Sequence, residues 1–410
     1  MRRTSLLALS AFVSLASLIT LPAIATAGGT QPVDIVLTAG PSGGKGGCDP
    51  SDQTACDLVR VRVNLGATTP TEVVTLVRAA DVGETGSGPG EQAVSPDGTA
   101  MVWLERVGHS SQLWGRKFTE AKNHLLVKSG PPKEGGAGMR PEWPAWLDGD
   151  TLLFDAKTGD ANGTEEKTVY TLDAPSLSSP GQPKAVLGNG ITPGLGLEDV
   201  AVFPAADGTA KVVGFGPVDQ GGKIVYPLSL STLSPEGRLK GSDSRPSLGK
   251  NANGKDIESC HHPAWNLSGD RILCMVHRPM ENIGGIKTRL LYSFAPSGST
   301  WNNVGRTFEP LPMEKSGLEI APEMSAAAGC QVITYKYAQY CQIDDYVVAS
   351  LFCAKEGKAS GRGAEIGASR IVLVHTNPVS YLDITRLVEK DRQLPVGGLE
   401  SFTATCRDAR

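Results

Sequence analysis

The chain has 410 residues, and 39 lysines and arginines against 43 aspartates and glutamates give it a formal net charge of −4 at pH 7. Charges of both signs are mixed along the sequence, so the clustered basic face of a nucleic-acid-binding protein is not indicated. The 49 glycines and 28 prolines are spread along the chain without a low-complexity linker. This distribution favours one large all-β unit with many turns.

The first 27 residues have the pattern of a secretory signal. The pair Arg2-Arg3 precedes an apolar run that ends at about Ile24, and Ala25-Thr26-Ala27 is a small-residue cleavage pattern. A single membrane anchor is the alternative, but the apolar run is barely long enough to span a bilayer. We therefore expect an exported protein, periplasmic or secreted, with cleavage near Ala27. Residues 28–410 would then form one domain without a membrane span.

Three β-prone runs follow the signal, at residues 32–38, 58–63 and 72–77. They resemble the second, third and fourth strands of a four-stranded unit whose first strand is missing.

A strand–turn–strand pattern then recurs five times along the chain. Its turns fall at Gly98, Gly149, Gly208, Gly269 and the pair Asp344-Asp345, between 51 and 75 residues apart. At the Asp-Gly and Gly-Asp turns, glycine permits the positive φ that a tight reversal requires. Each pair is followed by one or two further β-prone runs, which predicts four strands per repeat and hence the blades of a propeller. Long loops are expected at 156–167, 234–256 and 354–368.

A last β-prone run, at residues 399–405, resembles a first strand without a second. We expect it to join the three N-terminal strands as one composite blade, which closes the ring and leaves no open sheet edge at the seam. The predicted fold is an all-β, six-bladed β-propeller closed by strands from both ends of the chain.

The amino-acid sequences of two repeats resemble the repeat of a known family. Residues 93–98 read Ala-Val-Ser-Pro-Asp-Gly, and residues 262–270 read His-Pro-Ala-Trp-Asn-Leu-Ser-Gly-Asp. Both resemble the TolB-type repeat, roughly Pro-x-Trp-Ser-Pro-Asp-Gly before an apolar strand. The resemblance implies a six-bladed propeller that is commonly exported and usually non-enzymatic. The same repeat occurs beside peptidase domains, but no such domain follows in this chain.

Two adjacent histidines, His261 and His262, are the first candidates for a ligand site. They precede the predicted innermost strand of a blade and point to opposite faces if they lie in it, so one of them would face the central channel. Carboxylates at comparable places in other blades, Glu91, Glu142 and Glu198, would be its neighbours. His277 lies at the far end of the next strand, which argues against a three-histidine metal site. The alternative is that all of these are ordinary polar residues of the channel rim.

Eight cysteines in an exported chain predict disulfides rather than catalytic thiols. Cys260 and Cys274 flank the turn at Gly269 and are expected to bridge a hairpin. Cys341 and Cys353 flank the fifth turn less symmetrically and are expected to do the same. Cys48 and Cys56 would close a loop in the N-terminal blade, which leaves Cys330 and Cys406 to pair by elimination.

The sequence lacks the His-Glu-x-x-His and P-loop motifs, and it predicts no catalytic residues, metal or cofactor. The favoured function is therefore a monomeric, non-catalytic scaffold that binds a protein, a peptide or another component of the cell envelope. Two alternatives stay open. One is a propeller hydrolase or lyase acting on a polysaccharide or lactone at the channel mouth, and the other is a small-ligand or metal site that uses His261 or His262.

Overall fold

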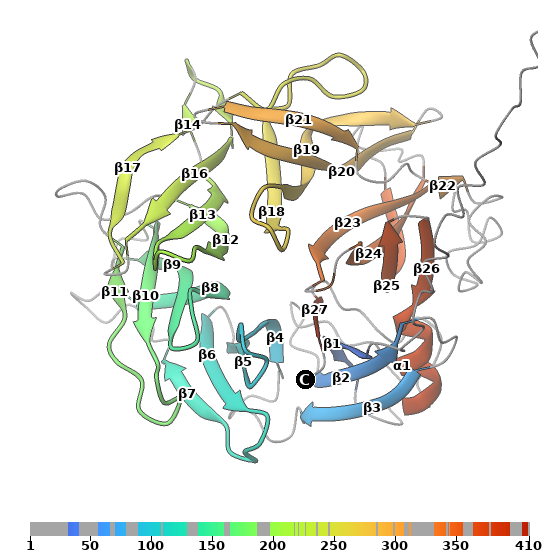
Figure 1. Ribbon diagram of the computed structural model, residues 1–410. Coiled ribbons are helices and arrows are strands. Elements are labelled where there is room, and N and C mark those ends of the chain that lie inside the picture. Colours follow the sequence, from blue (N-terminus) through green and yellow to red (C-terminus); the bar gives the residue numbers. More distant parts are fainter. Residues whose placement is uncertain are drawn as a thin grey trace, which may run out of the picture.

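The computed structural model is a ring of six antiparallel sheets around a central channel (Figure 1). The prediction of a six-bladed β-propeller is confirmed. The structure describes residues 32–40, 56–65, 70–78, 89–107, 110–128, 138–159, 165–186, 197–216, 218–219, 221–225, 227–234, 237–244, 247–283, 286–297, 300–306, 311–312, 332–341, 343, 345–355, 364–376, 379–393 and 404–408. The predicted secretory signal lies outside these residues.

Three blades are built from the two ends and the first third of the chain, and in each the strands follow one another from the channel outwards. The composite blade holds β27 (Ala404–Asp408), β1 (Pro32–Ala39), β2 (Asp57–Asn64) and β3 (Pro70–Val77); the second holds β4 (Pro89–Val94), β5 (Ala100–Val107), β6 (Ser110–Lys117) and β7 (His124–Val127); the third holds β8 (Gly138–Trp146), β9 (Thr151–Gly159), β10 (Glu165–Asp173) and β11 (Lys184–Ala185).

The other three blades follow in chain order. The fourth holds β12 (Glu198–Pro204), β13 (Ala210–Phe215), β16 (Leu228–Leu233) and β17 (Leu239–Ser244), with the small ribbon of β14 (Val218–Asp219) and β15 (Ile224–Val225) inserted; the fifth holds β18 (Ser259–Trp265), β19 (Ile272–Ile283), β20 (Ile286–Ser297) and β21 (Thr300–Arg306); the sixth holds β23 (Val332–Tyr340), β24 (Tyr346–Lys355), β25 (Ala364–Thr376) and β26 (Val379–Asp383), with β22 (Leu311–Pro312) beside the start of β23.

The apolar core is divided among the interfaces between neighbouring blades. Trp103 packs with Leu58 between the composite and second blades, and Phe154 packs with Leu113 between the second and third. Corresponding clusters fill the other four interfaces. Neighbouring blades cover each blade on both faces. Strands buried on both faces carry apolar residues on both sides. The burial of this surface holds the ring rigid around the channel.

The composite blade closes the ring as expected. β27 pairs antiparallel with β1, and Cys406 lies opposite Ile35. The predicted first strand at 399–405 overlaps the described strand, which covers Ala404–Asp408, and residues 399–403 lie outside the described residues.

Each of the three expected long loops contains strand residues. Residues 156–167 contain the end of β9 and the start of β10, which pair as far as Gly159 and Glu165, and residues 239–244 within the expected loop 234–256 form β17. In the expected loop 354–368, β25 begins at Ala364. Polar residues were interpreted as loop in each case, but a solvent-facing end of a hairpin carries polar residues as well.

The tight turns use positive φ at Gly98 (72°), Gly208 (79°) and Gly269 (65°), and Asp345 takes the same conformation (65°) in the fifth repeat. Gly149 does not. Its turn is held by the Asp148 carboxylate, which accepts hydrogen bonds from the backbone N–H groups of Asp150 and Thr151 at 2.8 and 2.7 Å. This Asx turn removes the need for a left-handed glycine.

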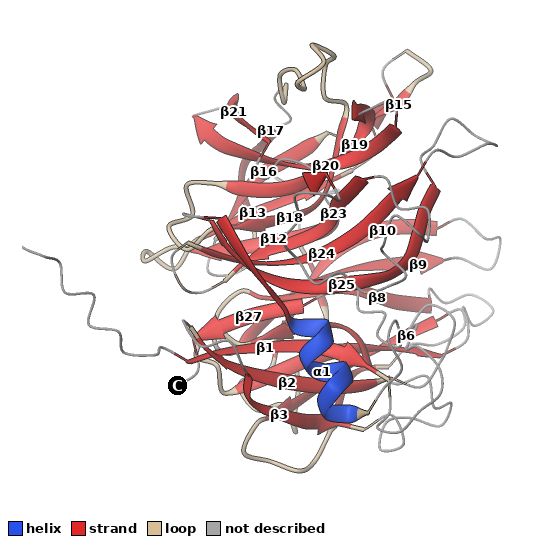
Figure 2. Ribbon diagram, turned by 90° about the vertical axis from the view of Figure 1, so that its right-hand side faces the viewer, coloured by secondary structure: helices blue, strands red, loops and turns tan. Residues whose placement is uncertain are grey.

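One helix was not predicted, α1 (Ile384–Arg392), which lies beside β25 and β3 (Figure 2). Asp383 caps its first turn by accepting from the Arg386 N–H, and the same carboxylate pairs with the buried Arg370. At its other end, Arg392 is 4% exposed and pairs with Asp57 of β2. The helix therefore fastens the sixth blade to the composite blade. In the part of the chain that the structure describes, no helix is long and apolar enough to cross a membrane.

The disulfides confirm one predicted pair and correct another. Cys260 and Cys274 are bridged across β18 and β19, with Cα atoms 5.7 Å apart. Cys341 bonds to Cys406, not to Cys353, with Cα atoms 4.6 Å apart. The predicted Cys341–Cys353 pair fails because Cys353 lies opposite Ile333, at the far end of the β23–β24 hairpin.

The same bond excludes the pairing of Cys406 with Cys330. Cys56 is also disulfide-bonded, whereas Cys48 and Cys330 lie outside the described residues. The Cys341–Cys406 bond joins the sixth blade to β27, so it covalently secures the strand that closes the ring.

Candidate functional site

A cavity of about 200 Å³ occupies the centre of the ring, where the innermost strands of all six blades converge. It is lined by short runs of β4, β8, β12, β18, β23 and β27. Each of these strands forms the inner edge of its blade or lies next to it. Among the described residues, no further strand pairs with the channel-facing edges of these strands except at the start of β23, where β22 pairs with it. Inner-strand backbone groups therefore lie around the cavity, and the carbonyls of Gln92, Ala93 and Ala201 accept hydrogen bonds from side chains.

Three neighbouring blades share an unusual backbone feature at this cavity. In β8, β12 and β18 the inner strand contains one extra residue, and a bulge follows Glu142, Glu198 and His261. The next residue takes a left-handed conformation each time: Trp143 with φ 47°, Asp199 with 51° and His262 with 51°.

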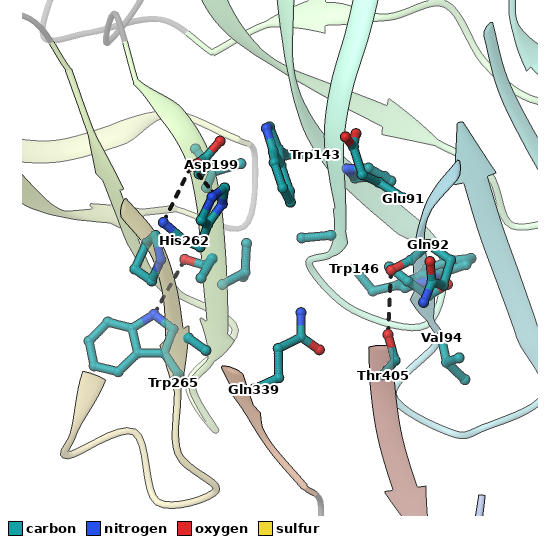
Figure 3. Close-up of a pocket in the computed structure, with 18 of the residues that line it drawn as sticks. Glu91, Gln92, Val94, Trp143, Trp146, Asp199, His262, Trp265, Gln339 and Thr405 are labelled. Atoms are coloured by element: carbon teal, nitrogen blue, oxygen red, sulfur yellow. Dashed lines mark hydrogen bonds and ion pairs between the residues drawn. The ribbon is translucent and has the colours of Figure 1, made fainter. Parts of the chain in front are cut away.

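A left-handed conformation costs a non-glycine residue energy, most of all a bulky one such as Trp143. Bulges redirect side chains, and here all three residues line the same cavity (Figure 3). Strain that recurs at one place in three blades points to a functional site.

Asp199 and His262 form the charged centre of this site. The Nδ1 atom of His262 lies 3.0 Å from Oδ2 of Asp199, and the backbone N–H of His262 donates to the same oxygen at 3.3 Å. The Asp199 side chain is 7% exposed and that of His262 is 21% exposed. A buried carboxylate therefore fixes the orientation of an imidazole that solvent can still reach from the channel.

Trp143 provides the aromatic wall. Its ring lies 4.7 Å from the His262 ring, centroid to centroid, with the two planes tilted by 50°. In the view of Figure 3 the indole stands between the His262 imidazole and the Glu91 carboxylate. Glu91 lines the same cavity from β4.

The remaining polar lining residues come from the blades opposite. Gln92 donates from Nε2 to the carbonyl oxygen of Val36 at 3.0 Å, and the Thr405 hydroxyl donates to the carbonyl oxygen of Gln92 at 3.4 Å. Gln339 projects into the cavity from β23 (Figure 3). Beside it, burial raises the pKa of the Tyr340 hydroxyl above its usual value.

The indoles of Trp146 and Trp265 close the cavity at the blade interfaces. Each donates from Nε1, at 3.3 Å, to the backbone of the preceding inner strand, at Ala93 and Ala201 respectively. They hold matching positions in their repeats. They hold the inner strands in register around the site.

The sequence candidates are distributed as follows. His262 and Glu91 line the cavity. His261 points elsewhere and packs on the Phe215 ring, 4.1 Å between centroids. Glu142 pairs with Lys157 at 3.2 Å and is not among the lining residues. Glu198 lies at the β12 bulge, and its side chain is outside the described part of the structure.

Sequence reasoning missed Trp143 and Asp199, each of which directly follows a proposed glutamate. Their signal was available only in the alignment of the repeats, because both occupy the position of His262 counted from the recurring alanines Ala145, Ala201 and Ala264. Among the described residues, no group of three or more His, Cys, Asp or Glu side chains is placed to hold a metal ion.

Solved structures with a similar fold include several propellers. TolB from Acinetobacter baumannii matches over 92% of this chain and 66% of its own length, just under two thirds, with 12% identity and a TM-score of 0.48. A nidogen/laminin complex matches over 91% of this chain and 98% of that one, at 7% identity and a TM-score of 0.45. A thermostable family-43 glycoside hydrolase matches over 72% and 92%, at 11% identity and a TM-score of 0.39.

At these identities the likeness concerns the fold alone. No protein-family model matches the chain and no curated protein matches its sequence. The TolB-type repeat therefore stays a resemblance.

Proposed function

We propose that this protein is an exported, monomeric, non-catalytic propeller that binds a segment of a protein or peptide partner in the cell envelope at the channel cavity. The observation that carries the proposal is the convergence of Trp143, Asp199 and His262, from three left-handed bulges, on one cavity surrounded by inner strands. An extended segment that enters the channel meets backbone hydrogen-bonding groups, which suit a peptide main chain. The side chains at the bulges would then select the sequence.

A displayed library of random peptides, selected on the purified protein, tests this function. We expect enriched peptides that bind the wild-type protein and lose affinity for Trp143→Ala. The matched control is Glu142→Gln, which changes the neighbouring residue on the same strand but leaves the cavity lining unchanged. Peptides that bind both variants equally well, or no enrichment at all, would contradict the proposal.

Export is part of the proposal and has its own test. The mature protein should begin near Gly28, because the cleavage pattern ends at Ala27. Mass spectrometry of the N-terminal peptide, recovered from the fraction outside the cytoplasm, measures this directly. Recovery of an uncleaved chain in the cytoplasm would contradict export.

The Asp199–His262 pair favours one alternative, a hydrolase or lyase acting on a polysaccharide or lactone. A carboxylate that orients an imidazole is an arrangement used in general base catalysis. Turnover of such a substrate that is abolished in His262→Gln would establish the alternative and replace the non-catalytic function.

A further inference from the structure

We infer that the group recognised in the channel cavity is the guanidinium of an arginine side chain on the bound segment. This inference rests on the proposed peptide-binding function and names the chemistry of its ligand. It follows from the charge, the aromatic wall and the size of the cavity.

The charge of the lining favours a cation. The described residues that line the cavity include two carboxylates, Glu91 and Asp199, and no lysine or arginine. The imidazole among them, His262, contacts Asp199. The two carboxylates disfavour an anionic ligand and attract a cation.

The aromatic wall favours a planar cation. The Trp143 indole is held in place by its bulge and by the His262 ring on one side. Indole is the best aromatic partner for a cation placed over its face. A guanidinium stacks on such a ring and at the same time donates paired hydrogen bonds to a carboxylate, which an ammonium cannot do. Glu91 and Asp199 lie on the same cavity as that ring.

The size of the cavity favours a single side chain over a whole small molecule. Its volume of about 200 Å³ is below the range of about 300–1,000 Å³ that is usual for sites enclosing drug-sized ligands. The amides of Gln92 and Gln339 and the inner-strand backbone surround it, and these neutral groups suit the main chain on either side of an inserted residue.

Three capped tripeptides that differ only in the central residue test the inference: acetyl-Gly-Arg-Gly-amide, acetyl-Gly-Gln-Gly-amide and acetyl-Gly-Glu-Gly-amide. Binding to the purified protein is measured by isothermal titration calorimetry. We expect the arginine peptide to bind at least about tenfold more tightly than the glutamine peptide. The glutamate peptide should bind most weakly.

Two variants test which cavity residues produce the preference for the arginine peptide. Asp199→Asn should remove most of the preference for arginine over glutamine, because asparagine tolerates the left-handed backbone but lacks the charge. Trp143→Phe should weaken arginine binding by about threefold, because phenylalanine keeps the ring but is a poorer cation partner. Glu142→Gln should leave the preference unchanged. Thermal unfolding of each variant shows whether the ring is intact.

The outcomes separate this inference from the function on which it rests. If the random library yields channel-dependent peptides without arginine, and the three tripeptides bind alike, the cation preference is wrong and peptide binding stands. If N,N′-diacetylchitobiose binds and competes at Trp143 while none of the peptides does, the cavity is a sugar site and both proposals are wrong.

Discussion

Gly269 is constrained both by its backbone and by its surroundings. Its φ is 65°, and a Cβ atom at this position would lie 2.4 Å from ring atoms of Phe203 in the neighbouring blade. Gly98 holds the equivalent turn in the second blade with φ 72°, but no atom lies within 4 Å of its added Cβ. The two glycines therefore separate the cost of backbone strain from the cost of a steric clash.

We predict that Gly98→Ala lowers the free energy of unfolding by about 1–2 kcal/mol, the cost of a left-handed alanine. Gly269→Ala should lower it by about 1–3 kcal/mol more, because the methyl group also overpacks the interface with Phe203. Urea denaturation measures both changes. Equal losses for the two variants would show that the fourth and fifth blades are not in close contact at this turn.

Two carboxylates should give opposite pH dependence of stability. Burial raises the pKa of Glu105, which is completely buried, whereas hydrogen bonds from Asn266 and Ser268 lower the pKa of Asp270. The contribution of protonated Glu105 is fully present below the usual glutamate pKa of about 4.3 and is lost as the pH rises through its folded-state value. The contribution of Asp270 is present above its usual pKa and is lost as the pH falls.

Urea denaturation between about pH 2 and pH 8 tests this pair of signs. Relative to wild type, Glu105→Gln should become more stable as the pH rises. Asp270→Asn should become less stable over the same interval. A difference that does not change with pH for either variant would contradict the corresponding shift.

The residues of the candidate site illustrate why sequence reasoning reached one of them and missed its partner. Counting alternate residues along a strand placed one of His261 and His262 in the channel, and His262 lines it. Glu142 and Glu198 were proposed because they hold comparable places in other blades, but a bulge follows each of them and shifts the side chains that come next. A left-handed tryptophan leaves no local signal in a sequence, so Trp143 could be found only by comparing the repeats.

At the scale of elements, strands with regular alternation were predicted well and α1 was not. The runs at 32–38, 58–63 and 72–77 correspond to β1, β2 and β3. Strand β26 leads directly into α1, so no turn residues in the sequence separate the helix from the strand before it. The helix is stabilised by tertiary contacts, above all by Arg392, which a local pattern cannot reveal.

Arg392 allows the contribution of α1 to be measured. Its guanidinium donates to the Gly40 carbonyl oxygen at 3.1 Å and to the Thr75 hydroxyl at 2.7 Å, and it pairs with the buried Asp57. Arg392→Ala should cost about 3–5 kcal/mol, because it leaves Asp57 buried without its charged partner.

The double variant Asp57→Asn/Arg392→Met should recover much of that loss, since it removes both charges and keeps most of the packing volume. Lys390→Ala, at an exposed position in the same turn of the helix, should change stability by no more than about 0.5 kcal/mol. Chemical denaturation of wild type and these three variants measures the changes. A double variant that is no more stable than Arg392→Ala would mean that the buried, unpaired charge is not the cause of the loss.

At the scale of the whole molecule, the number of blades followed from the count of repeats and the closure followed from the unmatched strands at the two ends. The disulfide at that closure did not follow. Cys341 and Cys406 are 65 residues apart, and they meet because β27 returns to lie beside β23 in the closed ring. Disulfide pairing between separate blades depends on the finished ring, whereas the pairing of Cys260 with Cys274 depends only on one hairpin.

This difference predicts unequal losses when the two disulfides are removed. The Cys260–Cys274 bond closes a loop of 14 residues and the Cys341–Cys406 bond one of 65. Loop entropy alone assigns about 3 kcal/mol to the first and about 4 kcal/mol to the second. Removal of the second also frees β27 to leave β1, which exposes the edge of the composite blade to other chains.

We therefore expect Cys341→Ala/Cys406→Ala to lower the melting temperature more than Cys260→Ala/Cys274→Ala. The first double variant should also aggregate more as the protein concentration rises. Differential scanning calorimetry and light scattering measure the two effects. Equal losses of stability without aggregation would show that the pairing of β27 with β1 holds the ring closed without the covalent bond.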